Sequence, residues 1–286
     1  MVILKKLALG LCCASILISC NDNKNVSTEE DLGEDSLTSV SETQKISAQN
    51  IFNSVPSPQE FTEIVYKTGL EYDGSILNNP DNYKKYSSDD AKALNLGVFG
   101  TDLSYTSVFE QTQESMVFLK CVNQACKSLG ISGVFDEHTF DRIEANKQHK
   151  DSLLIIISKS FWNADKFLRE NQRSGTSSLM LTGGWVEGLY LALNAAKTTK
   201  DKKVVTKIIE QKSALKDVIK LLELTKTNEE YSFLLKDLKD LNTFFESAPT
   251  FDNPKKDGTI DPKITSFIQE LDIKLTPLRN KVTGNV

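Results

Sequence analysis

The sequence predicts an all-α fold: a multi-helix bundle, or stacked helical hairpins, with eight to nine helices. Two long segments, 201–226 and 228–247, carry apolar residues at the 3.6-residue spacing of a helix with one buried face. The apolar positions are Val205, Ile208, Ile209, Leu215, Val218, Ile219 and Leu222 in the first segment, and Leu234, Leu238, Leu241 and Phe245 in the second. The connection between the two segments is short, which is typical of an antiparallel helical hairpin.

Capping residues and glycines set the limits of the earlier helices. Pro58 suits the first turn of a helix that runs to about residue 68, where Gly69 ends it. Residues 70–87 carry turn residues and three tyrosines, and we expect them to form a surface loop. Ser88 and the residue after it can cap a helix that continues to about residue 111, and the next helix runs from about 113 to 129.

The second half of the chain continues in the same way. Asp136 is expected to cap a short helix that ends near residue 146, and Asp151 or Ser152 a longer one that ends near 171. The run SLLIIIS within that segment also suits a strand, but helical spacing continues through Leu168, well beyond strand length. Further helices are expected at 177–197, 201–226, 228–247 and 261–283.

Composition limits the classes of function. The chain has 286 residues, of which 39% are hydrophobic and 26% charged, so it can bury a sizeable core. Its 34 basic and 39 acidic side chains include four lysines and seven acids in residues 1–50, which leaves 30 basic and 32 acidic for residues 51–286. Nucleic-acid binding needs a basic surface that displaces counterions from phosphates. A nearly neutral body therefore argues against a nucleic-acid partner.

The N-terminus has the order of a secretion signal. Lys5 and Lys6 precede an apolar stretch of 13 residues that is too short to remain as a membrane-spanning helix. The stretch ends in the sequence LISC at residues 17–20, followed by the polar residues NDNK. This segment resembles the lipobox signal peptide of bacterial lipoproteins, although Ile18 is slightly larger than the residue preferred there.

The resemblance implies processing and an address. Residues 1–19 are expected to be a signal peptide, and Cys20 is expected to become the lipidated N-terminus. Residues 20–50 then form a disordered, acidic tether, and residues 51–286 form the helical domain. The protein would be anchored by lipid in the bacterial cell envelope, at the outer membrane, facing either the periplasm or the surface. Several acyl chains together hold a protein durably on a membrane, whereas one does not.

Residues 179–196 carry a single charge, Glu187, in 18 positions. That length would allow a membrane-spanning helix, but a carboxylate near its middle would be costly in lipid. A central helix surrounded by other helices explains the composition better. Gly183 and Gly184 would then allow close approach to a neighbouring helix, as would Gly97 and Gly100 in the earlier helix.

These two helices also resemble each other. The sequence LNLGVFGTDLSY at 94–105 aligns with LMLTGGWVEGLY at 179–190, which pairs Asp102 with Glu187 and Tyr105 with Tyr190. A duplicated helical unit would produce this likeness, and so would chance among leucine-rich helices. Both interpretations remain open.

The aligned acids, Asp102 and Glu187, form the sharpest candidate site, with Tyr105, Tyr190 and Trp185 nearby in sequence. Two carboxylates that meet inside a bundle can share a proton, bind a metal or hold a cationic ligand. Alternatively, each acid is paired with a tyrosine hydroxyl, a lysine or an arginine and serves only to pack two helices.

No cofactor and no metal is predicted. The Glu-x-x-His pairs of di-metal bundles are absent, and the two histidines, His138 and His149, are expected to face solvent. Cys121 and Cys126 have a spacing unsuited to a disulfide within a helix, and we expect them to be buried free thiols. The sequence therefore favours a non-catalytic lipoprotein whose helical domain binds a protein partner or a small ligand. The alternative is an enzyme or metal-binding protein that uses the two carboxylates.

Overall fold

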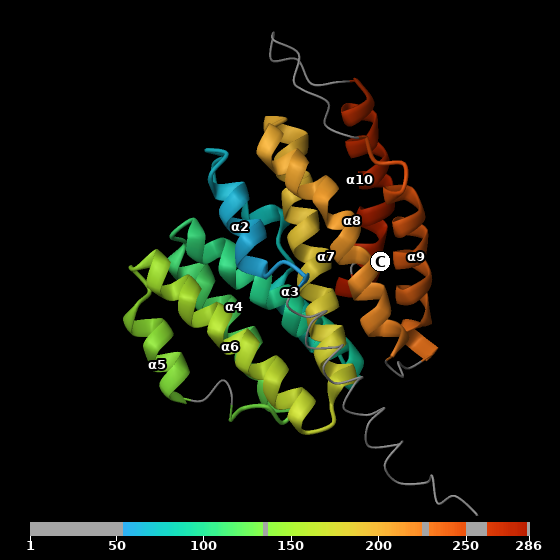
Figure 1. Cartoon of the computed structure of the whole chain (residues 1–286). Coiled ribbons are helices and arrows are strands. Elements are labelled where there is room, and N and C mark those ends of the chain that lie inside the picture. Colours follow the sequence, from blue (N-terminus) through green and yellow to red (C-terminus); the bar gives the residue numbers. More distant parts are fainter. Residues whose placement is uncertain (1–53, 134–136, 225–228, 250–261, 285–286) are drawn as a thin grey trace, which may run out of the picture. The chain divides into compact units, whose positions relative to one another are not determined.

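The computed structural model describes residues 54–133, 137–224, 229–249 and 262–284, and every regular element among them is helical (Figure 1). The all-α prediction is confirmed. The α-helices are α2 (Pro58–Tyr66), α3 (Asp89–Val108), α4 (Thr112–Ser128), α5 (Glu137–Ala145), α6 (Lys150–Glu170), α7 (Ser174–Thr199), α8 (Lys202–Glu223), α9 (Ser232–Phe245) and α10 (Pro262–Thr283). Three short 3-10 helices are η1 (Gly74–Ile76), η2 (Pro80–Lys85) and η3 (Glu229–Tyr231).

All these helices belong to one compact unit, residues 42–286. The expected signal peptide, Cys20 and the tether to residue 50 lie outside the described residues, as does the predicted cap Asp136. No helix in the described part of the chain is long and apolar enough to cross a membrane.

The helix ends follow local capping chemistry. The Ser88 side chain accepts a hydrogen bond from the Ala91 backbone N–H, and Asp201 caps α8 in the same way. Gly69, with φ of +76°, follows α2 in a left-handed conformation that suits glycine. Among the described residues, the cap predicted at Asp151 or Ser152 is wrong. Helix α6 begins at Lys150, and the side chain of His149, the residue before it, forms no capping hydrogen bond.

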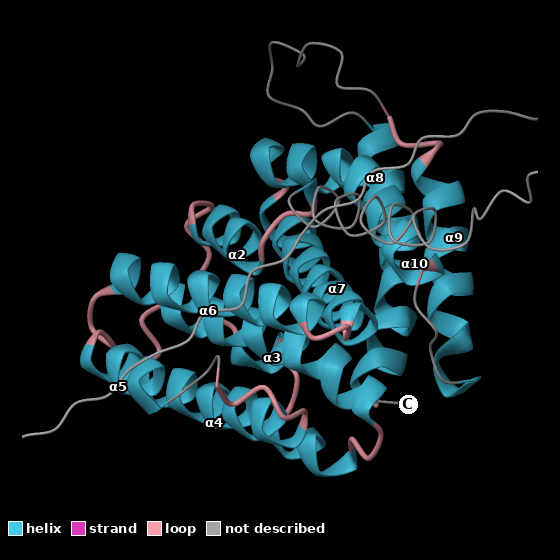
Figure 2. Ribbon diagram, turned by 60° about the horizontal axis from the view of Figure 1, so that its bottom comes forward, coloured by secondary structure: helices cyan, strands magenta, loops and turns pink. Residues whose placement is uncertain are grey.

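Helices α3 and α7 form the centre, and they contact each other more extensively than any other pair (Figures 1 and 2). Helix α7 also packs against α2 and α6 on one side and against α8 and α10 on the other. Both central helices are buried on nearly every face, so the prediction of a surrounded helix at 179–196 is confirmed. The predicted apolar stripes of α8 and α9 are buried as well, apart from the half-buried Ile209.

Glycines bring α3 and α7 together. A Cβ atom added to Gly97 would lie 1.9 Å from the Met180 carbonyl oxygen, and one added to Gly183 would lie 1.9 Å from the Leu94 oxygen. Neither backbone atom can move aside as a flexible side chain would. Thr101 adds a hydrogen bond across the same contact, from its Oγ1 to the Gly184 oxygen at 3.2 Å.

The aligned acids of the two central helices lie next to each other. Gly183 lies against Leu94, and Glu187, which follows on α7, lies near Asp102, which follows on α3. The two helices therefore run in the same direction. Each is followed by a helix that packs back on it, α4 on α3 and α8 on α7. A duplicated two-helix unit would give this arrangement, and the duplication remains a prediction.

The surface-loop prediction for residues 70–87 is only partly right, because about half of these residues are exposed and the others are not. This segment contains η1 and η2, and four of its side chains are buried: Leu77, Asn78, Asn82 and Tyr86. Polar turn residues indicated exposure from local sequence. The segment instead fills space between α3 and the end of α10, where its amide groups find partners.

Candidate functional site

Asp102 on α3 and Glu187 on α7 are brought together in the centre of the fold, and neither side chain is exposed to solvent. Asp102 is held by α3, which the Ser88 cap starts, and Glu187 by α7, whose glycines allow the close approach. The two carboxyl groups that the sequence singled out therefore share one buried environment.

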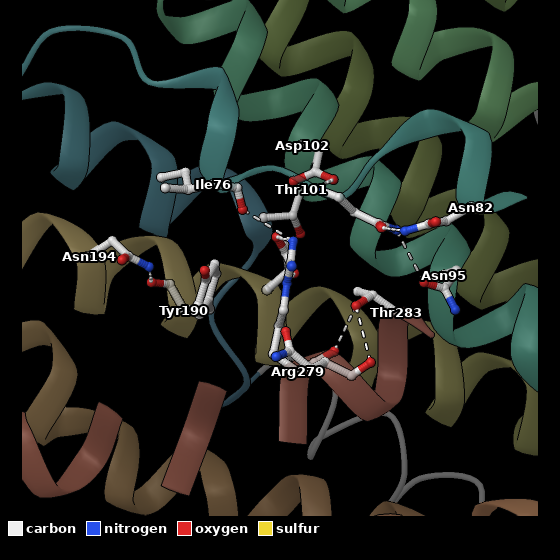
Figure 3. Close-up of polar contacts among 12 residues, drawn as sticks. Ile76, Asn82, Asn95, Thr101, Asp102, Tyr190, Asn194, Arg279 and Thr283 are labelled. Atoms are coloured by element: carbon white, nitrogen blue, oxygen red, sulfur yellow. Dashed lines mark hydrogen bonds and ion pairs between the residues drawn. The ribbon is translucent and has the colours of Figure 1, made fainter. Parts of the chain in front are cut away.

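Arg279 from α10 occupies the space beside this pair (Figure 3). Its Nε donates to Glu187 Oε2 at 2.9 Å and one of its terminal nitrogens donates to Oε1, also at 2.9 Å. The same terminal nitrogen donates to the Ile76 carbonyl oxygen at 3.2 Å, and the guanidinium lies 4.7 Å from the centre of the Tyr190 ring. Both oxygens of Glu187 are thus engaged by one planar cation, which is the strongest form of ion pair in proteins.

Sequence reasoning missed Arg279, although a signal was present. The buried face of α10 includes Leu271, Leu275 and Leu278, and Arg279 lies four residues after Leu275 on that face. A charged residue at an apolar position of a helix indicates a buried partner. The partner, Glu187, is 92 residues away in the chain, so only the fold identifies it.

The environment of Asp102 favours its neutral form. Its Oδ2 accepts a hydrogen bond from the Asn78 backbone N–H at 3.3 Å, and its Oδ1 has no hydrogen-bond partner among the described residues. Burial raises the pKa of Asp102 well above its ordinary value, the negative charge of Glu187 raises it further, and Arg279 opposes the shift. Protonation of Asp102, which the raised pKa favours, would leave one anion against one cation.

A buried amide network surrounds the cluster. The Asn78 Nδ2 donates to Tyr86 Oη at 3.0 Å, and this hydroxyl donates to the Thr283 carbonyl oxygen at 2.9 Å. The Asn95 Nδ2 donates to the Val282 oxygen at 2.9 Å, and the Asn82 Nδ2 to the Asn78 side-chain oxygen at 2.8 Å. Together these bonds attach the end of α10 to α3 and to the segment before it, which fixes the position of Arg279.

The other three candidate residues separate in space. Tyr190 lies against Arg279, whereas the Tyr105 hydroxyl accepts a hydrogen bond from the Asp73 backbone N–H at 3.4 Å. Trp185 is turned about 200° around α7 from Glu187, because each residue of a helix adds about 100°. Its ring nitrogen donates to Gln211 Oε1 at 3.0 Å. Trp185 therefore belongs to a different feature.

That feature is a cavity of about 340 Å³ between the start of α2 and the helices α3, α6 and α7. Its wall is formed mainly by apolar groups and glycines, among them Ile157, Phe161, Met180, Leu181 and Trp185. Gly97 and Gly184 at the α3–α7 contact line it as well. No local pattern in the sequence indicates this cavity, because it forms where side chains from four helices do not meet.

Three polar side chains that line the cavity are engaged elsewhere. Ser104 donates to the Gly100 carbonyl oxygen at 2.9 Å, Ser158 donates to the side chain of Gln59, and Trp185 donates to Gln211. A ligand inside would therefore meet an apolar surface. Lys159 is the only charged residue among those that line the cavity, and it is exposed.

The remaining reactive side chains lie apart from both features. Cys121 and Cys126 are buried free thiols, as predicted, and burial raises the pKa of Cys121 to about 11. His138 and His149 are exposed. In the described part of the chain no three histidine, cysteine, aspartate or glutamate residues are grouped so that they could hold a metal ion.

Comparison with known proteins adds no relative. No protein-family model matches the chain, and no curated protein sequence or solved structure shows a significant match.

Proposed function

We propose that the protein is a lipid-anchored protein of the bacterial cell envelope whose helical domain binds a small apolar ligand without chemical conversion. The observation that carries the proposal is the cavity between α2, α3, α6 and α7. Its volume of about 340 Å³ falls within the range of small-molecule sites, which are concave and mostly apolar.

The placement in the envelope rests on the N-terminal sequence. The apolar stretch, the small residue before Cys20 and the polar segment after it resemble the lipobox of bacterial lipoproteins. Cys20 would carry the lipid, and residues 20–50 would connect it to the helical domain at the outer membrane. A ligand-binding domain held near a membrane meets apolar molecules that leave the bilayer.

The buried carboxyl pair supports a structural role rather than a catalytic one. A metal or a substrate needs oxygens that it can reach, and both Glu187 oxygens are occupied by Arg279 inside the core. A neutral Asp102 adds no negative charge for a cation. The ion pair instead joins α7 to α10 at one defined position.

The chain provides its own optical probe for a binding test. It has two tryptophans, Trp162 and Trp185, and both line the cavity. The mature chain, residues 20–286 with Cys20→Ser, can be titrated without detergent with the neutral fluorophore N-phenyl-1-naphthylamine. We expect saturable binding at one site, seen as energy transfer from tryptophan to the fluorophore.

Two matched variants locate the site. Leu181→Asp puts a carboxylate into the half-buried wall of the cavity and should abolish binding, whereas Ile155→Asp, at an exposed position of α6 outside the lining, should not change it. Failure of the fluorophore to bind the unaltered chain, or equal binding by both variants, would overturn the proposed function.

A further inference from the structure

One charged residue, Lys159, is among the described residues that line the cavity. Lys159 is exposed and forms no ion pair with a described residue. The residues three and four positions away on α6 are Ile155, Ile156, Trp162 and Asn163, so the helix offers it no acid. Lys166 on the same helix contrasts with it, because Lys166 lies 3.9 Å from Glu170.

An exposed aromatic ring lies three residues after Lys159 on the same helix. Trp162 lines the cavity and remains 47% exposed, which is unusual for the largest side chain, and Lys166 Nζ lies 5.8 Å from its ring centre. Lys159 and this indole both line the cavity, so they present a positive charge and an apolar face to it. The rest of the lining is mainly apolar, and the donors of Ser104, Ser158 and Trp185 are engaged elsewhere.

We infer that the cavity binds a single-chain amphiphile with an anionic head, with the hydrocarbon chain inside and the head at Lys159. This inference rests on the proposed function and specifies its ligand. A neutral apolar molecule would leave Lys159 without a partner, and a cationic head would be repelled by it.

The volume sets the length of the chain. A water molecule takes about 30 Å³ of liquid, and a methylene group is of similar size, so about 340 Å³ holds a chain of about eleven carbons. Longer chains would leave carbons outside, where burial no longer contributes about 0.8 kcal/mol for each methylene. Affinity should therefore rise with chain length up to about twelve carbons and then level off.

The anionic head has two natural sources, a fatty acid carboxylate and the phosphate of a one-chain phospholipid. Both present a negative oxygen at the end of an acyl chain, and Lys159 can bind either. Parallel titrations with dodecanoate and with a twelve-carbon lysophosphatidic acid distinguish them, because the source with the lower Kd is the better ligand.

The test uses tryptophan fluorescence of the mature chain, below the concentration at which the probes form micelles. Dodecanoate or the lysophosphatidic acid should bind about three to five times more tightly than dodecanol, which is the upper part of the range for one exposed ion pair. Lys159→Met should remove this preference and leave dodecanol binding unchanged. Lys120→Met, at an exposed position of α4 outside the cavity lining, should keep it.

The outcomes separate the two proposals. Equal affinity for dodecanoate and dodecanol, or a preference that survives in Lys159→Met, would overturn the anionic ligand while binding of the neutral fluorophore still supports the cavity as a ligand site. Affinity that keeps rising beyond sixteen carbons would also overturn it, because the chain would then not be enclosed. If neither the anionic amphiphiles nor the neutral fluorophore bind to the unaltered chain, the proposed function itself is overturned.

Discussion

Replacing Gly97 by alanine should destabilise the fold far more than the same replacement at Gly184, which lies opposite Gly97 on α7. The Gly97 Cβ would lie 1.9 Å from the Met180 carbonyl oxygen and 2.5 Å from the Gly184 nitrogen. Ordinary contact begins at 3.4 Å, so α3 and α7 would have to separate by more than 1 Å at their closest point.

The free-energy difference follows from two opposing effects. Overpacking of a close contact costs about 1–3 kcal/mol, and a clash between backbone atoms belongs at the upper end because no rotamer change relieves it. Alanine in place of glycine inside a helix gains about 1 kcal/mol. Gly97→Ala should therefore lose about 2 kcal/mol of unfolding free energy, whereas Gly184→Ala, with its nearest neighbour at 3.4 Å, should be neutral or gain up to about 1 kcal/mol.

Urea denaturation of the mature chain, followed by circular dichroism at 222 nm, measures both variants. Gly183→Ala should behave like Gly97→Ala, because its Cβ would lie 1.9 Å from the Leu94 oxygen. If all three variants shift the midpoint equally, or if Gly97→Ala is stabilised, then α3 and α7 do not meet at these glycines and the reasoning fails.

Three further predictions concern the charged cluster and the anchor. Arg279→Met should lower the free energy of unfolding by about 3–5 kcal/mol, because it leaves Glu187 buried without the arginine. Adding Glu187→Gln to this variant should recover at least half of the loss in the same urea assay. Asp102→Asn should become more favourable relative to the unaltered chain as pH rises from 5 to 8. Because the pKa of Asp102 is raised in the folded chain, the folded chain holds a proton that the unfolded chain releases. The free energy of unfolding therefore falls as pH rises, by up to about 1.4 kcal/mol for each pH unit, and asparagine removes that fall. A difference between the two chains that does not change with pH would refute the shared burial of the two carboxyl groups. Cys20→Ser should abolish incorporation of a labelled fatty acid, whereas Cys13→Ser should not, and labelling of the Cys20→Ser variant would refute the lipobox assignment.

The helices could be predicted because their signals are local. Ser88 and Gly69 act on backbone groups within four residues of themselves, and the apolar stripes of α8 and α9 indicate burial at each turn. The burial of α7 could also be predicted, because a helix with one charge in 18 residues has no polar face to expose to solvent. Even the close approach of α3 and α7 was visible in their glycines.

The contacts of the site residues could not be predicted, because they join residues that are close in space but far apart in sequence. Asn78 stands among turn residues that suggested a surface loop, yet its backbone N–H bonds Asp102, 24 residues later. Arg279 reaches Glu187 across 92 residues, and the cavity joins parts of four helices. A sequence pattern shows that a residue is buried, but it does not show what lies beside it.

The two features on α7 depend on each other through its geometry. Glu187 faces the ion pair with α10, and Trp185, about 200° away around the helix, faces the cavity, which Gly184 also lines. Walls that are free to move close a cavity in part, because contact between apolar groups is favourable. Here one wall is held by the bidentate Arg279 contact behind α7, and the spacing to α3 is set by the backbone contact at Gly97. The ion pair on one side of α7 thus helps to hold the helix that carries Trp185 in the wall of the cavity on the other side.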